Sequence, residues 1–280
     1  MVRIRLMTEI DVAFAISLTD HEGWGNLPAD FQRLIALNPK GCFVACERDE
    51  PAGMISTTAH GDYAFMGSLI VRPDYRGHGI GETLMRHAMK HLESQNVACI
   101  ELDGTFVAAT LYRRLGFLDK YLSLRFKRNP DADAALHTQP AREARATPAS
   151  ETVISLDARL SELDRRAILT RFSYEFPDSF YLDATSPRGY AFVYPRAGRR
   201  VAIGPLVAED TSIAGDLLDH VIDDYADLEI TIGVLQPKND AVALLMSRGF
   251  VHKPPSLRMY RGLRRDYERF IFGIISPEKG

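Results

Sequence analysis

Cysteine, tryptophan and long apolar runs are scarce in this sequence. The chain of 280 residues has three cysteines and one tryptophan. An odd, small cysteine count does not predict a disulfide framework, and no cysteine pair has zinc-ligand spacing with histidines nearby. We therefore expect buried, reduced thiols and no metal site. No apolar run approaches the roughly 18 residues that a membrane-spanning helix needs, so we expect no membrane partner.

A marked excess of one charge is also lacking. Lys and Arg number 34 against 37 Asp and Glu, which gives a net charge of -3 at pH 7. Nucleic-acid-binding domains are usually basic, so the sequence predicts no nucleic-acid partner. Glu9 and Asp11 interrupt the first apolar stretch. This argues against a secretory signal, and we expect a cytoplasmic protein.

The length corresponds to about two folded domains. Residues 129–150 are rich in Ala, Pro and polar residues, and Leu136 is their one large apolar residue. Such a stretch cannot bury much surface, so we expect a linker there. The linker divides the chain into a first domain over 1–128 and a second domain over 151–280.

Hydrophobic patterns predict a mixed α/β fold for the first domain. Alternating or continuous short apolar runs predict strands, and apolar residues four positions apart from Ile80 onward predict a helix. The glycine at 116 ends the last expected helix. The expected strands cover 2–6, 42–47, 52–58, 64–71 and 97–102, and the expected helices cover 11–18, the stretch from Ile80 and 105–115.

The second domain repeats the later part of the first. Residues 67–71 (GSLIV) match 204–208 (GPLVA), and 108–117 match 241–250, so both copies end in Gly-Phe. The second copy is four residues shorter between its strand and its helix, where the first carries several glycines. The repeat predicts two related units with unequal chemistry.

The glycine-rich loop is the strongest chemical signal. Arg76-Gly77-His78-Gly79-Ile80-Gly81 follows a strand and opens a helix. Glycines let the backbone approach a ligand closely, and a helix N-terminus offers unpaired N–H groups. This predicts a phosphate or pyrophosphate site, to which Arg72 and Arg76 can add charge. The loop lacks the Lys-Ser/Thr of a P-loop and follows a fourth strand, so neither a nucleoside triphosphate nor a dinucleotide fits well.

These residues resemble the Gcn5-related N-acetyltransferases, the GNAT family. The family pattern (Gln/Arg)-x-x-Gly-x-(Gly/Ala) is matched by 76–81, and a second motif by Leu111-Tyr112-x-x-Leu115-Gly116-Phe117. The layout of the whole chain resembles a bacterial two-domain subgroup with a degenerate second copy. The resemblance implies an α/β (α+β) tandem GNAT fold, with a mixed, mostly antiparallel sheet flanked by helices and repeated twice.

The resemblance also implies acetyl-CoA as co-substrate, without a metal. The loop amides would bind its pyrophosphate, the strand at 69–71 would pair with its pantetheine arm, and Tyr112 would be the general acid. Splaying of the fourth and fifth strands would offer the amide of Leu69 or Ile70 to the carbonyl oxygen. The implied cofactor contacts are Leu69, Ile70, Val71, Arg76, Gly77, His78, Gly79, Ile80, Gly81, Glu82 and Thr83.

The group that removes the proton of the amine stays open. Asp103, Glu22, His60 and Asp62 are candidates, and a chain of waters can replace any of them. Asp103 is expected directly after the fifth strand, where it can equally cap the next helix. Glu22 and Trp24 lie between helices that usually line the acceptor site in this family, so shaping that site competes with proton removal.

The second domain lacks the phosphate loop. It has Leu245 at the position of Tyr112, and Glu209 and Asp210 place negative charge where a pyrophosphate would sit. Negative side chains there disfavour a bound anion. We therefore expect 151–280 to support the first domain without binding CoA.

Two classes of function follow. The first is an acetyl-CoA-dependent N-acetyltransferase that acetylates a primary amine of a small or amino-acid-like molecule. The second is a non-catalytic acyl-CoA-binding sensor or regulatory protein. Tyr112 and the intact loop favour the enzyme. The acceptor, the acyl chain length and the oligomeric state, a homodimer included, are left open by the sequence.

Overall fold

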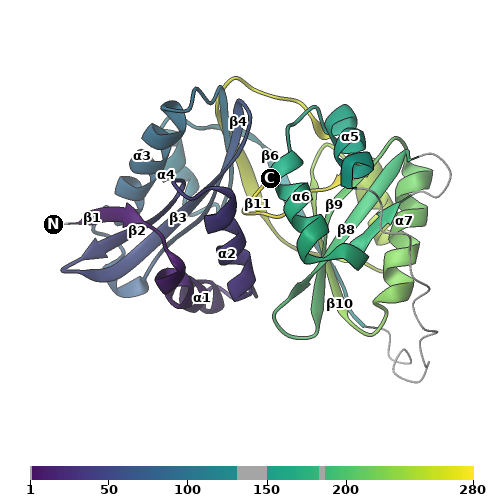
Figure 1. The fold of residues 1–280 in the computed structure, drawn as a ribbon, viewed down its shortest axis with the longest axis horizontal. Helices are drawn as coiled ribbons and strands as arrows, with labels where there is room; N and C mark the ends of the chain where they lie inside the picture. The colour runs from purple at the N-terminus through teal and green to yellow at the C-terminus, as the bar shows by residue number, and fades with distance from the viewer. Residues whose placement is uncertain (1, 131–149, 183–186) are drawn as a thin grey trace. The chain divides into compact units, whose positions relative to one another are not determined.

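The chain forms two compact units (Figure 1). The computed structural model describes residues 2–130, 150–182 and 187–280, so most of the expected linker lies outside the described residues. Unit 1 comprises Met1–Lys120, Leu257–Arg265 and Pro277–Gly280, and unit 2 comprises Tyr121–Ser256 and Asp266–Ser276.

The sheet of unit 1 is antiparallel except at one place. Its order is β1-β2-β3-β4-β5-β11, and only β4 and β5 run parallel. The five expected strands coincide with β1 to β5, whereas β11 was not predicted. The strands are β1 (Arg3–Leu6), β2 (Cys42–Glu47), β3 (Glu50–His60), β4 (Tyr63–Val71), β5 (Cys99–Gly104) and β11 (Val251–Gly262), of which the part from Leu257 belongs to unit 1.

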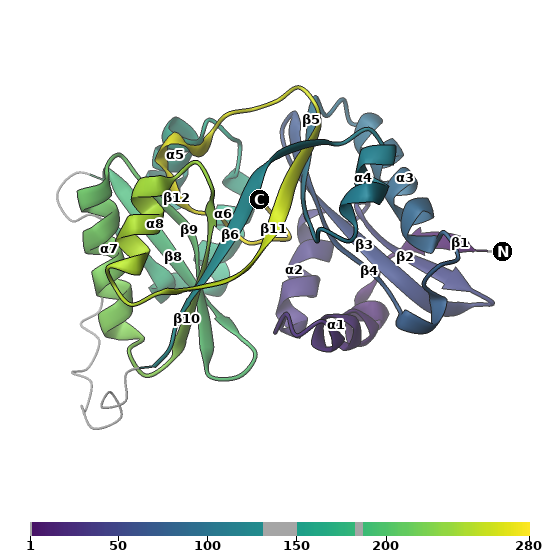
Figure 2. The same cartoon turned by 180° about the vertical axis from the view of Figure 1, so that it is seen from behind.

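Helices cover both faces of this sheet (Figures 1 and 2). On one face, apolar residues of α1 and α2 pack with Met54 and Ile70 in one core cluster. On the other face, Leu84 of α3 lies beside Gly53. Gly53 and Met54 face opposite ways because side chains alternate along a strand. The helices of unit 1 are α1 (Val12–His21), α2 (Pro28–Leu37), α3 (Ile80–Glu93) and α4 (Ala109–Arg114).

Two sequence predictions at the end of β5 are wrong in position. Asp103 was expected after the fifth strand but lies inside β5, because β11 keeps pairing with β5 as far as Gly104. The following helix was expected from 105 but α4 starts at Ala109. Residues 105–108 instead form a turn, in which the Ala108 amide donates to the carbonyl oxygen of Thr105 at 3.0 Å.

Unit 2 has the same layers. Its strand order is β6-β10-β9-β8-β7, with β12 paired to β9. Apolar residues of α7 and α8 pack against one face of the sheet. On the α6 side, the ring of Phe172 stacks on that of Phe192 of β8, with 4.3 Å between the ring centres. The elements are β6 (Leu118–Arg128), α5 (Ser150–Ser161), α6 (Arg166–Glu175), β7 (Phe180–Leu182), β8 (Gly189–Arg196), β9 (Arg200–Ala208), α7 (Thr211–Asp224), β10 (Glu229–Leu235), α8 (Asn239–Met246) and β12 (Ile271–Gly273). The expected mixed, helix-flanked fold is confirmed in both halves.

Each unit takes its last strand from the other repeat. β6 follows the first repeat, and its residues from Ser123 to Arg128 pair with β10 in unit 2. β11 follows the second repeat, and its residues from Leu257 to Gly262 pair with β5 in unit 1. The boundaries expected at 128 and 151 follow the order of the sequence, whereas the compact units interleave along the chain.

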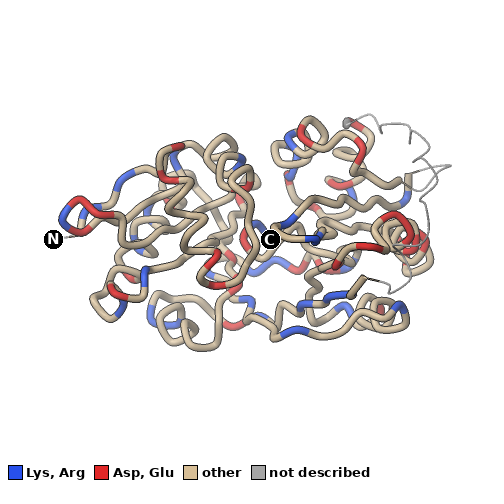
Figure 3. The backbone as a smooth tube through the Cα atoms, turned by 90° about the horizontal axis from the view of Figure 1, so that it is seen from below, with Lys and Arg blue, Asp and Glu red and all other residues tan. Residues whose placement is uncertain are grey.

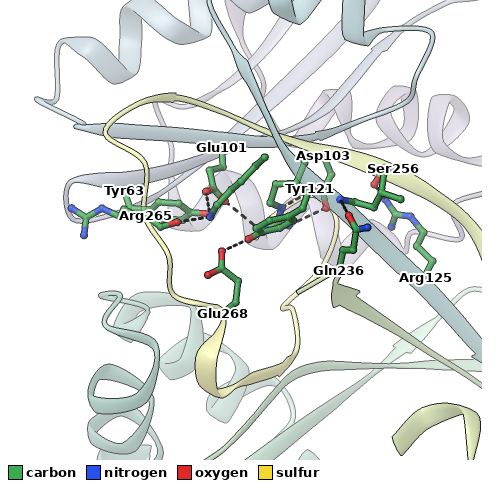
Figure 4. A network of polar contacts seen from close by, with 12 residues as sticks. Tyr63, Glu101, Asp103, Tyr121, Arg125, Gln236, Ser256, Arg265 and Glu268 are labelled. Carbon is green, nitrogen blue, oxygen red and sulfur yellow. Dashed lines mark hydrogen bonds and ion pairs between the residues drawn. The ribbon is translucent and has the colours of Figure 1, made fainter. Parts of the chain in front are cut away.

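Two buried carboxylates of β5 depend on this exchange. Glu101 accepts hydrogen bonds from Tyr63 Oη at 3.1 Å and from Lys120 Nζ at 2.8 Å (Figure 4). Asp103 accepts two hydrogen bonds from Arg258 of β11, at 2.8 and 2.9 Å. The four charged side chains are 0% exposed. Buried charges are tolerated only when they are paired, so β11 supplies unit 1 with a cation that it needs.

We expect Arg258→Ala to destabilise the protein by about 3–5 kcal/mol, because it removes this cation from beside a buried carboxylate. Arg261→Ala is the matched control on the same strand. Arg261 pairs with Glu93 at the surface, with 35% and 50% of the side chains exposed, and should cost less than about 1 kcal/mol. Denaturant unfolding measures both losses, and equal losses would contradict a special role for Arg258.

Candidate functional site

The two parallel strands of unit 1 separate partway along β4. They pair from Tyr63 with Cys99 as far as Met66 with Leu102, and no further. Just beyond, the register of β4 against β3 shifts between Gly67 and Ile70, and Ser68 has a φ of 53°. A bulge of this kind bends a strand and increases its twist. β4 therefore turns away from β5, which opens the strand edge that contains Leu69, Ile70 and Val71.

The glycine loop follows directly where β4 ends. Gly77 and Gly79 have φ values of 83° and 76°, which glycine adopts without strain, and α3 begins after them at Ile80. A Cβ at either glycine would meet nothing within 4 Å, so the space beside both is open. The first helical hydrogen bond runs from the Thr83 amide to the Gly79 carbonyl oxygen, at 3.0 Å. The preceding amides of α3 have no acceptor within the helix and suit an anion.

Charged side chains surround this loop and fix its shape. Arg76 donates to the Val71 carbonyl oxygen at 2.9 Å and pairs with Glu22 at 2.7 Å, so two predicted site residues 54 positions apart meet. Glu82, in the first turn of α3, pairs with Arg86 at 2.7 Å and Arg114 at 3.5 Å. Hydrogen bonding from Arg86 lowers the pKa of Glu82. The resulting carboxylate holds two cations beside the helix N-terminus.

The remaining charge near the loop is also paired locally. Arg72 binds Asp74 at 2.6 Å, and its guanidinium lies 4.8 Å from the centre of the Tyr75 ring. His78 is exposed, with Nδ1 3.4 Å from the Tyr75 carbonyl oxygen. Over the residues that the structure describes, basic and acidic positions are interspersed (Figure 3).

Tyr112 lies at the end of β5 on the short helix α4. A Cβ at Gly104 would lie 2.3 Å from Cε2 of Tyr112, so only glycine at 104 lets this ring pack against the strand. The ring also makes an edge contact with Phe117, with 6.3 Å between centres. Burial raises the pKa of Tyr112 to about 12. The phenol therefore keeps its proton at neutral pH and can donate it or a hydrogen bond.

The candidate bases are held by other side chains of unit 1. Arg258 binds Asp103, Arg76 binds Glu22, and Arg265 binds Asp62. His60 is buried and stacks on Tyr63, with 6.1 Å between ring centres. Trp24 is partly buried and packs against the core cluster of α1 and α2.

Two positions of the site escaped the sequence analysis. Gly104 leaves room for the Tyr112 ring, and Arg258 binds Asp103, which lies 155 positions earlier in the sequence. The signal for Gly104 was its place beside Asp103 at the end of a strand. Nothing local signalled Arg258, because its partner is set by strand pairing. Among the described residues, no group of three metal-ligating side chains gathers and no helix is long and apolar enough to cross a membrane.

The equivalent place in unit 2 is filled by the chain itself. β9 and β10 pair in parallel as far as Ile203 with Ile232 and then separate. β12 pairs with β9 beyond that point, and the Ile274 amide donates to the Gly233 carbonyl oxygen of β10 at 3.0 Å. A strand of the protein therefore lies between the separated ends. In unit 1, no described strand pairs with the separated ends of β4 and β5 on that side.

Unit 2 also differs at the helix that follows. The Asp210 carboxylate accepts a hydrogen bond from the Ile213 amide at 3.0 Å and caps α7. Hydrogen bonds from Arg188 and Arg159 lower the pKa of the neighbouring Glu209, which stays ionised and pairs with both arginines before α7. Buried Leu245 occupies the position that matches Tyr112. At these positions unit 2 therefore differs from unit 1 in each feature that predicts its site.

Comparison with known proteins gives the same assignment for both halves. The model "Acetyltransferase (GNAT) family" matches residues 10–117, and "Acetyltransferase (GNAT) domain" matches 153–273. A holothin acyltransferase from Pseudoalteromonas sp. (strain SANK 73390) is 25% identical over 265 residues, which are 92% of this chain and 88% of the relative.

Solved structures share the fold over nearly the full chain. A provisionally assigned acetyltransferase from Pyrococcus horikoshii superposes with a TM-score of 0.83 at 22% identity, over 100% of this chain and 96% of that one. A tandem GNAT protein from the clavulanic acid biosynthesis pathway gives 0.61 at 15% identity, over 95% and 100%. The two family matches together span most of the sequence, and the protein belongs to the GNAT acetyltransferase family, with two GNAT domains in tandem.

Proposed function

We propose that unit 1 transfers an acetyl group from acetyl-CoA to the primary amine of a small, amino-acid-like molecule. The observation that carries this proposal is the open glycine loop at the N-terminus of α3, next to separated strands and a buried, protonated tyrosine. The relative named holothin acyltransferase supports acyl transfer to a small molecule. Cytoplasmic location stays a prediction.

The residues present fit an acyl-CoA. Positive φ at Gly77 and Gly79 turns the loop around open space, and the first amides of α3 can bind a pyrophosphate. Arg86 and Arg114, held by Glu82, add positive charge at that end of α3. The edge of β4 at Leu69–Val71 has lost β5 as a partner, so its backbone groups can pair with the amides of the pantetheine arm.

Transfer requires a neutral amine. An amine with a pKa of about 10.4 is neutral in less than about one molecule in a thousand at pH 7, so a proton must leave before or during attack. The carboxylates of Asp103, Glu22 and Asp62 are bound to arginines, which stabilise their ionised form and weaken them as bases. A chain of waters that ends on one of these carboxylates would accept the proton of the amine instead.

The reaction forms a C–N bond and breaks a C–S bond. An amide at Leu69 or Ile70, on the separated edge of β4, would donate to the carbonyl oxygen as negative charge develops. Tyr112 would donate its proton to the departing sulfur. Burial raises the pKa of a thiol as well as that of a phenol: in this same unit the pKa of Cys99 rises to about 12. Burial thus makes a departing thiolate a stronger base, which favours proton transfer from the phenol.

The loop generates the first test. We expect Gly79→Glu to weaken acetyl-CoA binding at least about 100-fold, about 2.7 kcal/mol, because a carboxylate enters the space meant for pyrophosphate. Gly249→Glu is the matched control, since Gly249 has a φ of 78° and also meets nothing within 4 Å. Titration calorimetry measures both affinities. An unchanged affinity in Gly79→Glu would refute the proposed site.

Tyr112 generates the second test. We expect Tyr112→Phe to lower kcat by about 100-fold or more while the Kd of acetyl-CoA stays unchanged, because only the proton donor is lost. In the parent, kcat/KM should rise with pH from 7 to 9 as the amine loses its proton. Its tyrosine, with a pKa of about 12, should impose no decline in that range. Tyr260→Phe serves as control, and an equal kcat in both variants would exclude Tyr112 as the acid.

Unit 2 generates the third test. β12 lies between β9 and β10, and Asp210 caps α7, so we expect one acetyl-CoA per chain. Equilibrium dialysis with labelled acetyl-CoA measures the number, and Gly79→Glu should reduce it from one to none. Two molecules per chain, or one remaining in that variant, would show that unit 2 binds the cofactor.

A further inference from the structure

A short segment, Pro277–Gly280, belongs to unit 1 although the residues directly before it belong to unit 2. It packs along β4. A Cβ at Gly67 would lie 2.4 Å from the carbonyl oxygen of Glu278 and 2.7 Å from its Cα. A Cβ at Gly280 would lie 3.0 Å from Cδ2 of Phe65 and 3.1 Å from Oη of Tyr63. The 277–280 segment therefore runs with its backbone directly against this strand.

The strand register shows which face the segment covers. Ser56 pairs with Gly67 and Met54 with Ile70, so the bulge places Gly67 and Ile70 on the same face of the sheet. Ile70 packs in the core cluster of α1 and α2. The 277–280 segment thus lies on the α1 and α2 face, whereas α3 lies on the opposite face.

The segment also lies at the point along β4 where pairing with β5 ends. Pairing between β4 and β5 ends at Met66, Gly67 is the next residue, and the bulge at Ser68 follows. In the proposed reaction the acetyl group reaches this point from the glycine loop before α3. The amine must approach the carbonyl carbon from another direction, and the α1 and α2 face lies opposite α3, which the loop opens. Glu278 therefore stands beside the path of the acceptor.

The second repeat shows that this close approach is built into the fold. Gly204 is the repeat position that matches Gly67. A Cβ at Gly204 would lie 2.2 Å from the carbonyl oxygen of Ile275. The same stretch of chain thus passes against both matching glycines, first in unit 2 and three residues later in unit 1. Glycine is needed at both positions for one reason, the passage of this backbone.

The segment brings two charges to that place. Glu278 is 6% and Lys279 is 2% exposed. Burial raises the pKa of Cys42 to about 12, and the ammonium of Lys279 is near enough to oppose this rise. Cys42 of β2 pairs with Ser56, and Ser56 pairs with Gly67, so these three residues lie level with one another across the sheet. Lys279 therefore lies near the same level as Gly67. A buried carboxylate and a buried ammonium match the charges of an amino-acid-like acceptor.

We propose that the 277–280 segment forms part of the acceptor-binding surface of unit 1 and that Glu278 binds the ammonium of the acceptor. Glu278 is then a specificity-determining residue that favours cationic amines over neutral ones. The inference rests on the proposed acetyl transfer. It adds a carboxylate that no family motif of the sequence includes.

The experiment compares Glu278→Gln with the parent on the best amine found in a screen of small amino acids and diamines. We expect the KM for the amine to rise about tenfold or more, because a charge-assisted hydrogen bond is lost, and the KM for acetyl-CoA and kcat to change less than about threefold. Glu93→Gln, the same change on the exposed end of α3, is the matched control and should leave all three constants unchanged.

The outcomes separate the two proposals. If the parent turns over amines and Glu278→Gln keeps the same amine KM, the role of Glu278 is refuted while acetyl transfer stands. A lower unfolding temperature with an unchanged amine KM would show a structural role only and refutes it as well. If the parent acetylates no amine in the screen, the proposed function fails and the inference falls with it.

Discussion

Pairing of buried charge on β5 is the constraint on which unit 1 of this protein depends. Glu101 and Asp103 stand inside the sheet of unit 1 and are compensated by Lys120 and by Arg258. Arg258 lies on a strand that follows the second repeat, so unit 1 cannot complete its core from the first repeat alone. The next residue of β5, Gly104, seats Tyr112. Charge compensation and the position of the proposed acid therefore share one strand.

Strand separation explains why two copies of one fold differ in chemistry. In both units two parallel strands pair for four residues and then part. In unit 2 the chain places β12 between the separated ends and caps the following helix with Asp210. In unit 1 glycines and free amides stand at the matching place. Both units thus share the separated parallel strands, and they differ in what lies between the separated ends.

The stretch from Ile271 to Gly280 contributes to the matching places of both units. It fills the separated strands of unit 2, passes Gly204, and then packs against Gly67 in unit 1. A side chain at Gly67 or Gly204 would clash with the backbone of this stretch, so both positions require glycine. In the proposed reaction, the second repeat would contribute to acetyl transfer through this segment, in addition to strand β11.

The sequence by itself determined the family, the glycine loop, the mixed fold of both halves and the loss of that loop in the second copy. These features are local: glycine spacing, apolar periodicity and motif residues follow one another along the chain, so they can be recognised without coordinates. Only the tertiary structure decided that Arg258 neutralises Asp103, that Gly104 admits the Tyr112 ring, that β12 closes unit 2 and that Glu278 reaches Gly67. The Arg258 pair depends on strand exchange, and the other three depend on how α4, β12 and the 277–280 segment pack. No periodicity records which segment of the chain becomes a neighbour in this way.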